Sequence, residues 1–101
     1  MRVVWSLRAE TDLDRIEDYI AQDNPSAALE TRDRIEFQVK HLKDQPRMGR
    51  TGRVRGAREL VVTGLPYIVV YRTTKNAVEI ARVLHGANHV DCRHVRRANV
   101  G

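Results

Sequence analysis

The chain has 101 residues, enough for one compact domain but not for a second hydrophobic core. Of these residues 42% are hydrophobic and 31% are charged, and the longest apolar run, residues 67–71, is far shorter than the roughly 20 residues of a membrane-spanning helix, so we expect no membrane partner. Cys92 is the only cysteine, which excludes an intrachain disulfide and favours a reducing, cytoplasmic location.

The net charge of +5 is spread unevenly along the chain. Residues 1–50 contain nine Lys/Arg and ten Asp/Glu, whereas residues 51–101 contain nine Lys/Arg and only three Asp/Glu. The basic excess therefore belongs to the second half. Such an asymmetry suggests an anionic partner, either a nucleic acid or an acidic protein segment.

The first half of the chain predicts a short strand and two helices. Residues 3–5 are β-branched or aromatic, and Ser6 after them is a good helix N-cap. Helical spacing of apolar residues follows over about residues 7–23, and Asn24-Pro25 ends this helix and starts a second that runs to about residue 44. Because the turn between them is short, the helices are expected to lie antiparallel. The expected buried stripes are Ala9, Leu13, Ile16 and Ile20 on the first helix, and Ala28, Ile35, Val39 and Leu42 on the second.

Phe37 does not belong to the buried stripe of the second helix. It lies two positions after Ile35, which places it roughly 200° away around a helix of 3.6 residues per turn. A large aromatic side chain at that position either packs on another element or marks a surface for a partner. We take Phe37 as the candidate partner-binding residue.

The second half predicts an arginine-rich loop followed by three strands. Residues 45–57 contain three glycines, four arginines and no acidic residue. Strands are expected at residues 58–62, 67–72 and 78–84. The turns between these strands are short, so antiparallel pairing is expected.

The element order strand, helix, helix, strand, strand, strand predicts a two-layer α+β domain. A helical hairpin would cover one face of a mainly antiparallel sheet. The other face would stay partly open, and the basic residues are expected to gather there. We assign residues 1–88 to this domain and residues 89–101 to a basic C-terminal tail.

Six segments, in this order and with Trp5 ahead of the first helix, resemble the RelE/ParE toxin superfamily over residues 2–88. They are Asp12-Leu13-x-x-Ile16-x-x-Tyr19-Ile20, Asn24-Pro25-x-Ala27-Ala28, Pro46-x-Met48-Gly49-Arg50, Arg58-Glu59-Leu60, Pro66-Tyr67-Ile68-Val69-Val70-Tyr71-Arg72 and Glu79-Ile80-x-Arg82-Val83-Leu84-His85-Gly86.

The resemblance implies a toxin of a type II toxin–antitoxin system, which a cognate antitoxin holds inactive in a hetero-oligomer. In such systems the antitoxin packs against the helical hairpin and the sheet. Phe37 and the basic second half would suit an amphipathic, acidic antitoxin segment. Operator DNA would be bound only through the antitoxin. A nucleic-acid-binding regulator without toxicity is disfavoured, because neither helix has a basic face for a DNA groove.

The superfamily offers two targets, and the RelE-like one is mRNA on the ribosome. Cleaving mRNA needs a base, an acid and cations on the phosphate. His85 is the candidate catalytic residue, although a histidine at a strand end is more often only hydrogen-bonded. The candidate residues for binding phosphate or the target are Arg53, Arg55, Arg58, Arg72 and Arg82. Arg72 and Arg82 also have a structural interpretation, as partners of Glu59 or Glu79.

The ParE-like target is DNA gyrase, which is poisoned by binding without catalysis. No Glu, Asp or Lys lies between Gln45 and Arg58, and no tyrosine follows His85, at the positions where many RNase members carry such groups. We therefore favour the non-enzymatic, gyrase-directed interpretation, with the ribosome-dependent endonuclease as the alternative. No cofactor is expected. No metal site is expected either, since the spacing of the histidines at 41, 89 and 94 matches no common ligand set.

Overall fold

The computed structural model describes residues 1–86, so the predicted tail over 89–101 and Cys92 lie outside the described residues. In chain order the elements are β1 (Arg2–Trp5), α1 (Leu7–Ala21), α2 (Pro25–Lys40), the 3-10 helix η1 (His41–Lys43), β2 (Arg50–Thr51), β3 (Arg58–Val61), β4 (Tyr67–Thr73) and β5 (Ala77–His85).

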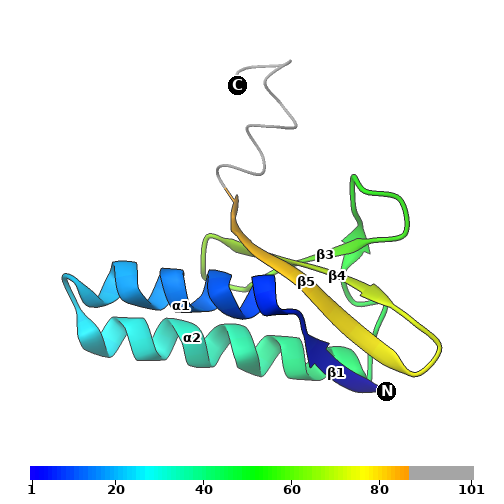
Figure 1. Cartoon of the computed structure of the whole chain (residues 1–101), viewed down its shortest axis with the longest axis horizontal. Coiled ribbons are helices and arrows are strands. Elements are labelled where there is room, and N and C mark those ends of the chain that lie inside the picture. The colour runs from blue at the N-terminus through cyan, green and yellow to red at the C-terminus, as the bar shows by residue number, and fades with distance from the viewer. Residues whose placement is uncertain (87–101) are drawn as a thin grey trace, which may run out of the picture.

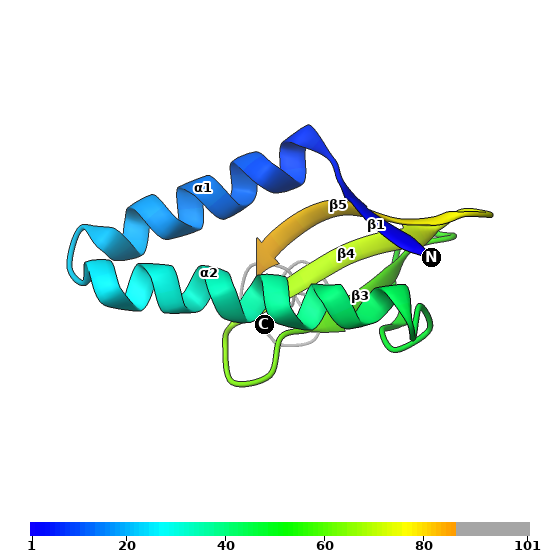
Figure 2. The ribbon, with the colours of Figure 1, turned by 90° about the horizontal axis from the view of Figure 1, so that it is seen from below.

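The five strands form one sheet in the order β1-β5-β4-β3-β2. β1 runs parallel to β5, and the other neighbouring pairs are antiparallel. Figure 1 and Figure 2 show the helical hairpin as one layer and the twisted sheet as the other. The predicted two-layer α+β class is confirmed. One strand was missed: β2 has only two residues within the arginine-rich loop, too few for a periodic pattern to reveal.

Local capping starts both helices where the sequence predicts. Ser6 Oγ accepts a hydrogen bond from the Ala9 amide at 3.0 Å, and Asn24 Oδ1 accepts one from the Ala27 amide at 3.1 Å. α1 ends at Ala21, two residues earlier than expected, and η1 continues α2 close to the predicted end. No helix within residues 1–86 is both long and apolar enough to cross a membrane.

The hydrophobic core lies between the hairpin and one face of the sheet. Both tyrosines of β4 pack into this core, and three of the four residues of each predicted helix stripe are either buried in it or packed against it. Ile20 is half-buried, and Ala28 is buried outside this cluster. The core residues are Ala9, Leu13, Ile35, Val39, Leu42, Leu60, Val62, Tyr67, Val69, Tyr71, Val78, Ile80 and Val83.

The alternation of side chains along β4 and β5 decides which residues face away from the helices. Val69 and Tyr71 belong to the core, so Val70 between them faces the other side of the sheet. Arg82 pairs with Val70, and Tyr71 pairs with Ile80, which leaves Ala81 as the extra residue of a β-bulge. The bulge therefore places Arg82 on the face that the hairpin leaves uncovered.

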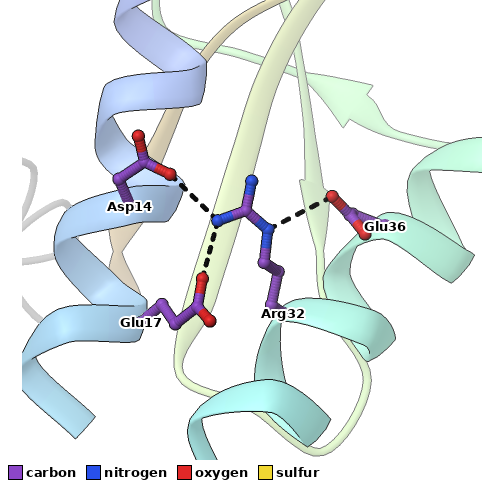
Figure 3. A network of polar contacts seen from close by, with 4 residues as sticks. All are labelled: Asp14, Glu17, Arg32 and Glu36. Carbon is purple, nitrogen blue, oxygen red and sulfur yellow. Dashed lines mark hydrogen bonds and ion pairs between the residues drawn. The ribbon is translucent and has the colours of Figure 1, made fainter. Parts of the chain in front are cut away.

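A four-residue ion network joins the two helices (Figure 3). Arg32 of α2 contacts Asp14 at 3.0 Å and Glu17 at 2.7 Å on α1, and Glu36 one turn along α2 at 3.4 Å. The hydrogen bonds that Arg32 donates to Asp14 and Glu17 raise the pKa of Arg32. A single cation thus bridges three carboxylates and reduces the repulsion among them across the hairpin.

Replacing the cation of this network is expected to weaken the hairpin. We predict that Arg32→Met lowers the free energy of unfolding by about 1 kcal/mol, because it leaves three carboxylates without their shared partner. The loss should shrink in about 1 M salt, where charges are screened. Urea unfolding at low and at high salt measures the loss of unfolding free energy under each condition. Arg15→Met is the control, since Arg15 forms no ion pair within residues 1–86, and an equal loss in both variants would contradict the prediction.

Candidate functional site

A groove of about 450 Å³ lies on the face of the sheet away from the helices. The tip of the arginine-rich loop, residues 54–57, forms one wall, and β4 and β5 form the floor. Three of the five predicted binding arginines line it: Arg55 from the loop, Arg72 from β4 and Arg82 from β5. The groove is accordingly cationic, as the charge of the second half predicts.

Arg82 is held in place by Asp12 of α1. The guanidinium donates to both carboxylate oxygens, from Nε at 2.8 Å and from Nη2 at 3.1 Å, and the Val83 amide donates to Oδ2 at 2.9 Å. Burial opposes ionisation of Asp12, but the hydrogen bonds from Arg82 and Val83 outweigh it and hold the pKa of this carboxyl below its ordinary value. The same contact raises the pKa of Arg82. The sequence could not reveal this pair, because 70 residues separate its members.

The side chains of Arg72 and Arg55 are held by fewer contacts than that of Arg82. Arg72 Nε lies 3.3 Å from Glu79 Oε1 across the β4–β5 pair, and both side chains are largely exposed, so this ion pair stabilises the fold little. This confirms one of the structural partners considered for Arg72. Arg55 forms no ion pair within the part of the chain that the structure describes. Both guanidinium groups are thus available to an anion in the groove.

The remaining predicted arginines do not line the groove. Arg58 donates to the Gly49 carbonyl oxygen at 2.8 Å and so ties the start of the loop to β3. Arg53 is exposed, and its amide lies 3.4 Å from a carboxylate oxygen of Glu59. Arg50 contacts the other oxygen of this buried carboxylate at 3.3 Å. Arg53 and Arg58 therefore lie outside the groove that Arg55, Arg72 and Arg82 line, and their contact with a target stays a prediction.

The buried hydroxyl of Tyr71 anchors the base of the arginine-rich loop. It accepts a hydrogen bond from the Gly49 amide and donates one to the Pro46 carbonyl oxygen, both at 2.8 Å. Burial raises the pKa of this hydroxyl, so it stays protonated and able to donate at neutral pH. A Cβ at Gly49 would lie only 2.6 Å from the tyrosine oxygen. The close approach requires glycine at this position.

His85 lies apart from the arginine groove. It lines a different cavity, between α1 and the end of β5, where its ring meets Tyr67 edge-on with centroids 5.5 Å apart. His85 pairs with Tyr67, a core residue, whereas Arg82 faces the uncovered side. Their odd spacing of three along a strand was the sequence signal for this separation. The arginines and the predicted base are not brought together.

Among residues 1–86, Glu79 supplies the one carboxylate that lines the arginine groove, and the sequence suggested only a salt-bridge role for it. Because three guanidinium groups also line the groove, it is suited to bind phosphates or acidic side chains. Within residues 1–86 no group of three or more His, Cys, Asp or Glu side chains is placed to hold a metal ion. Phe37 is exposed on α2, as its position off the buried stripe predicts.

Comparison with known proteins places this geometry in context. Residues 3–90 match the family model described as the ParE toxin of type II toxin–antitoxin systems. Y4kP of Sinorhizobium fredii, whose name assigns it provisionally to the toxins, is 44% identical over 84 residues, covering 83% of this chain and 86% of the relative. Toxin RelE2 of Caulobacter vibrioides is 38% identical over 86 residues, covering 85% and 96%.

Two solved structures share the fold. The chromosomal ParDE TA system from P. aeruginosa contains a chain that is 30% identical with a TM-score of 0.78, covering 84% of this chain and 95% of that one. The toxin–antitoxin complex RelBE2 from Mycobacterium tuberculosis contains one that is 24% identical with a TM-score of 0.56, covering 83% and 95%. At that identity the second shows the fold alone.

The Asp12 contact generates a prediction about pH. Because the folded pKa of Asp12 is lowered, its stabilising effect is complete above its ordinary pKa of 3.8 and is lost as pH falls through the folded value. Asp12→Asn should lower the unfolding free energy by about 2 kcal/mol at neutral pH. The difference from the wild type should shrink as pH falls below 3.8 and disappear only below the folded pKa of Asp12, which denaturant titrations across pH measure. Asp18→Asn, on the exposed side of α1, is the control, and a difference independent of pH would refute this account of Asp12.

The tyrosine anchor generates a second prediction. Tyr71→Phe removes one donor and one acceptor from a buried site, so we expect about 1–2 kcal/mol of destabilisation. The Gly49 amide should also exchange its hydrogen faster, because it loses its acceptor. Tyr67→Phe is the matched control, since no hydrogen bond of its hydroxyl is found within residues 1–86. Unchanged exchange at Gly49 would show that Tyr71 does not hold the loop.

Proposed function

The chain belongs to the ParE family of type II toxins, and from this premise we propose that it arrests bacterial growth by binding and poisoning DNA gyrase. A cognate antitoxin, encoded beside it, holds it inactive. The 30% identical chain of the chromosomal ParDE TA system from P. aeruginosa supports such a partner. Operator DNA is contacted only through the antitoxin.

The observation that carries the gyrase proposal is the separation of cations from the candidate base. The arginine groove gathers Arg55, Arg72 and Arg82, while His85 lines another cavity. An endonuclease needs its proton-transfer groups within hydrogen-bonding reach of the phosphate that its cations hold. A toxin that acts by binding needs only the cationic surface, which supports a non-enzymatic mode of action.

The arginines suit an acidic target surface or the phosphates of gyrase-bound DNA. A guanidinium can donate two parallel hydrogen bonds to a carboxylate or a phosphate. Arg82 has little freedom, because Asp12 orients it, so it meets a target without losing much side-chain entropy. Arg55 and Arg72 then adapt to the shape of the bound group.

The second candidate function is ribosome-dependent cleavage of mRNA. The observation that favours it is the same arginine groove, since three guanidinium groups around one concavity also fit a phosphodiester. The similarity to toxin RelE2 adds weight to this alternative. Under it, Arg55, Arg72 and Arg82 hold the phosphate, and the transfer of protons requires His85 or Glu79 to approach the 2′-hydroxyl.

The two targets leave different traces after expression without antitoxin. We expect growth arrest with induction of the DNA-damage response and gyrase-linked DNA breaks. The Arg55→Glu variant should need an about tenfold higher toxin dose for arrest, because it loses one ionic contact with the target. Arg47→Glu, in the same loop but outside the groove, is the control. Sequencing of DNA breaks and of mRNA ends distinguishes gyrase-linked DNA damage from mRNA cleavage. Intact DNA together with codon-phased mRNA cuts would replace the gyrase proposal with the endonuclease.

A further inference from the structure

A second cationic groove, of about 250 Å³, lies between the first half of α1 and the strand β5. Arg8 and Arg15 line it from the helix, and Arg82 lines it from the strand. We call it the α1 groove. Because Arg82 also lines the arginine groove, the two grooves meet at this side chain. The cationic surface therefore continues from the open face of the sheet, around the edge of β5, onto α1.

The charge of the two joined grooves is mainly positive. Five arginines and two carboxylates line them within residues 1–86. Both carboxylates already form ion pairs, Asp12 with Arg82 and Glu79 with Arg72. The other three arginines form no ion pair within the described residues and keep their full hydrogen-bonding capacity for an anion. They are Arg8, Arg15 and Arg55.

The α1 groove leads into the cavity that His85 lines, since Asp12 and Arg15 belong to the walls of both. This cavity, of about 390 Å³, contains the rings of Tyr19, Tyr67 and His85, and we call it the Tyr19 cavity. Tyr67 is buried, whereas Tyr19 is 73% exposed. Tyr19 lies one turn after Arg15, so the two side chains share one face of α1. An exposed aromatic ring thus lies beside an arginine at the end of the cationic surface.

A row of arginines that leads to an exposed ring is suited to a single strand of nucleic acid. Its phosphates repeat along the chain and pair with guanidinium groups, and its unpaired bases stack on aromatic side chains. The Tyr19 cavity has the size of a small-ligand pocket. An acidic peptide matches the arginines but has no base to place on Tyr19. In a duplex the bases are already stacked on each other, so none is available to the cavity.

We propose that the α1 groove and the Tyr19 cavity bind a single strand of nucleic acid, with phosphates on Arg8 and Arg15 and a base against Tyr19. The strand continues past Arg82 into the arginine groove. This inference deepens the proposed function and rests on it for the source of the strand, which is the DNA that gyrase holds. Under the second candidate function the source is mRNA. His85 meets a base in this arrangement and not the phosphate in the arginine groove, so the contact does not make it a catalytic residue.

Fluorescence anisotropy of labelled DNA and RNA single strands of about ten nucleotides tests the proposal on the whole toxin, free of antitoxin. Tyr19→Ala should weaken binding about tenfold, because a stacked base is lost, and should leave the salt dependence of binding unchanged. Tyr19→Phe keeps the ring and should bind like the wild type. Thermal melts confirm that each variant folds.

The arginine contacts have a different signature in the same assay. Arg15→Gln should weaken binding about fivefold and reduce the slope of log K against log salt by about 0.7, because one phosphate contact is lost. Arg47→Gln is the control, since Arg47 is exposed but lies outside all three cavities.

The outcomes separate this inference from the proposed function. If the wild type binds neither strand, or if Tyr19→Ala and Arg15→Gln bind as tightly as their controls, the strand site is overturned while gyrase-linked breaks still support the gyrase proposal. If polyglutamate displaces the strand as well as an unlabelled strand of equal length does, the surface takes any polyanion and the inference fails. If the variants behave as expected but arrested cells keep intact DNA, the gyrase proposal fails and the strand site stands. Tighter binding of DNA indicates gyrase-held DNA as the source and tighter binding of RNA indicates mRNA, and either supports the site.

Discussion

One carboxylate, that of Asp12, ties α1 to β5 through three hydrogen bonds beside the hydrophobic core. β1 pairs with β5 only as far as Ile80, so within residues 1–86 the edge of β5 beyond that residue has no strand beside it. Ser6 and Asp12 take the place of the missing strand. The Ser6 hydroxyl donates to the Ala81 carbonyl oxygen at 3.0 Å, and Asp12 accepts from the Val83 amide. Buried backbone groups that would otherwise lack partners are thereby satisfied, and α1 is fixed in position against the core.

The same carboxylate connects fold to function through Arg82. A guanidinium on the open face would normally sample many rotamers, but this one is drawn around the edge of β5 to Asp12. The groove that contains it lies on the face of the sheet away from the helices.

Features that depend on neighbouring residues could be predicted from the sequence. The caps at Ser6 and Asn24, the buried stripes of both helices and the antiparallel β3–β4–β5 order follow from local spacing and turn chemistry. The comparisons then established the toxin family that the motifs suggested. The exposure of Phe37 followed from its angle around α2, because helical geometry is regular.

Features that depend on residues far apart in the chain could not be predicted. The burial of Glu59 beneath the arginine-rich loop and the pairing of Arg82 with Asp12 both require the finished sheet. The bulge at Ala81 reverses which residues of β5 face the helices, and no sequence pattern indicates this bulge. It determines that Arg82 shares a face with Arg72, and the spacing of three residues then places His85 on the opposite face.

The most direct test of this account is an NMR titration that follows the carboxyl carbon of Asp12 and the amide proton of Val83 in the same sample. The account predicts that both signals change together, with a midpoint below the ordinary pKa of 3.8, because one carboxylate binds both the guanidinium and the amide. A midpoint at or above 3.8, or a Val83 amide that does not respond, would contradict the claim that Asp12 joins the hairpin to the sheet.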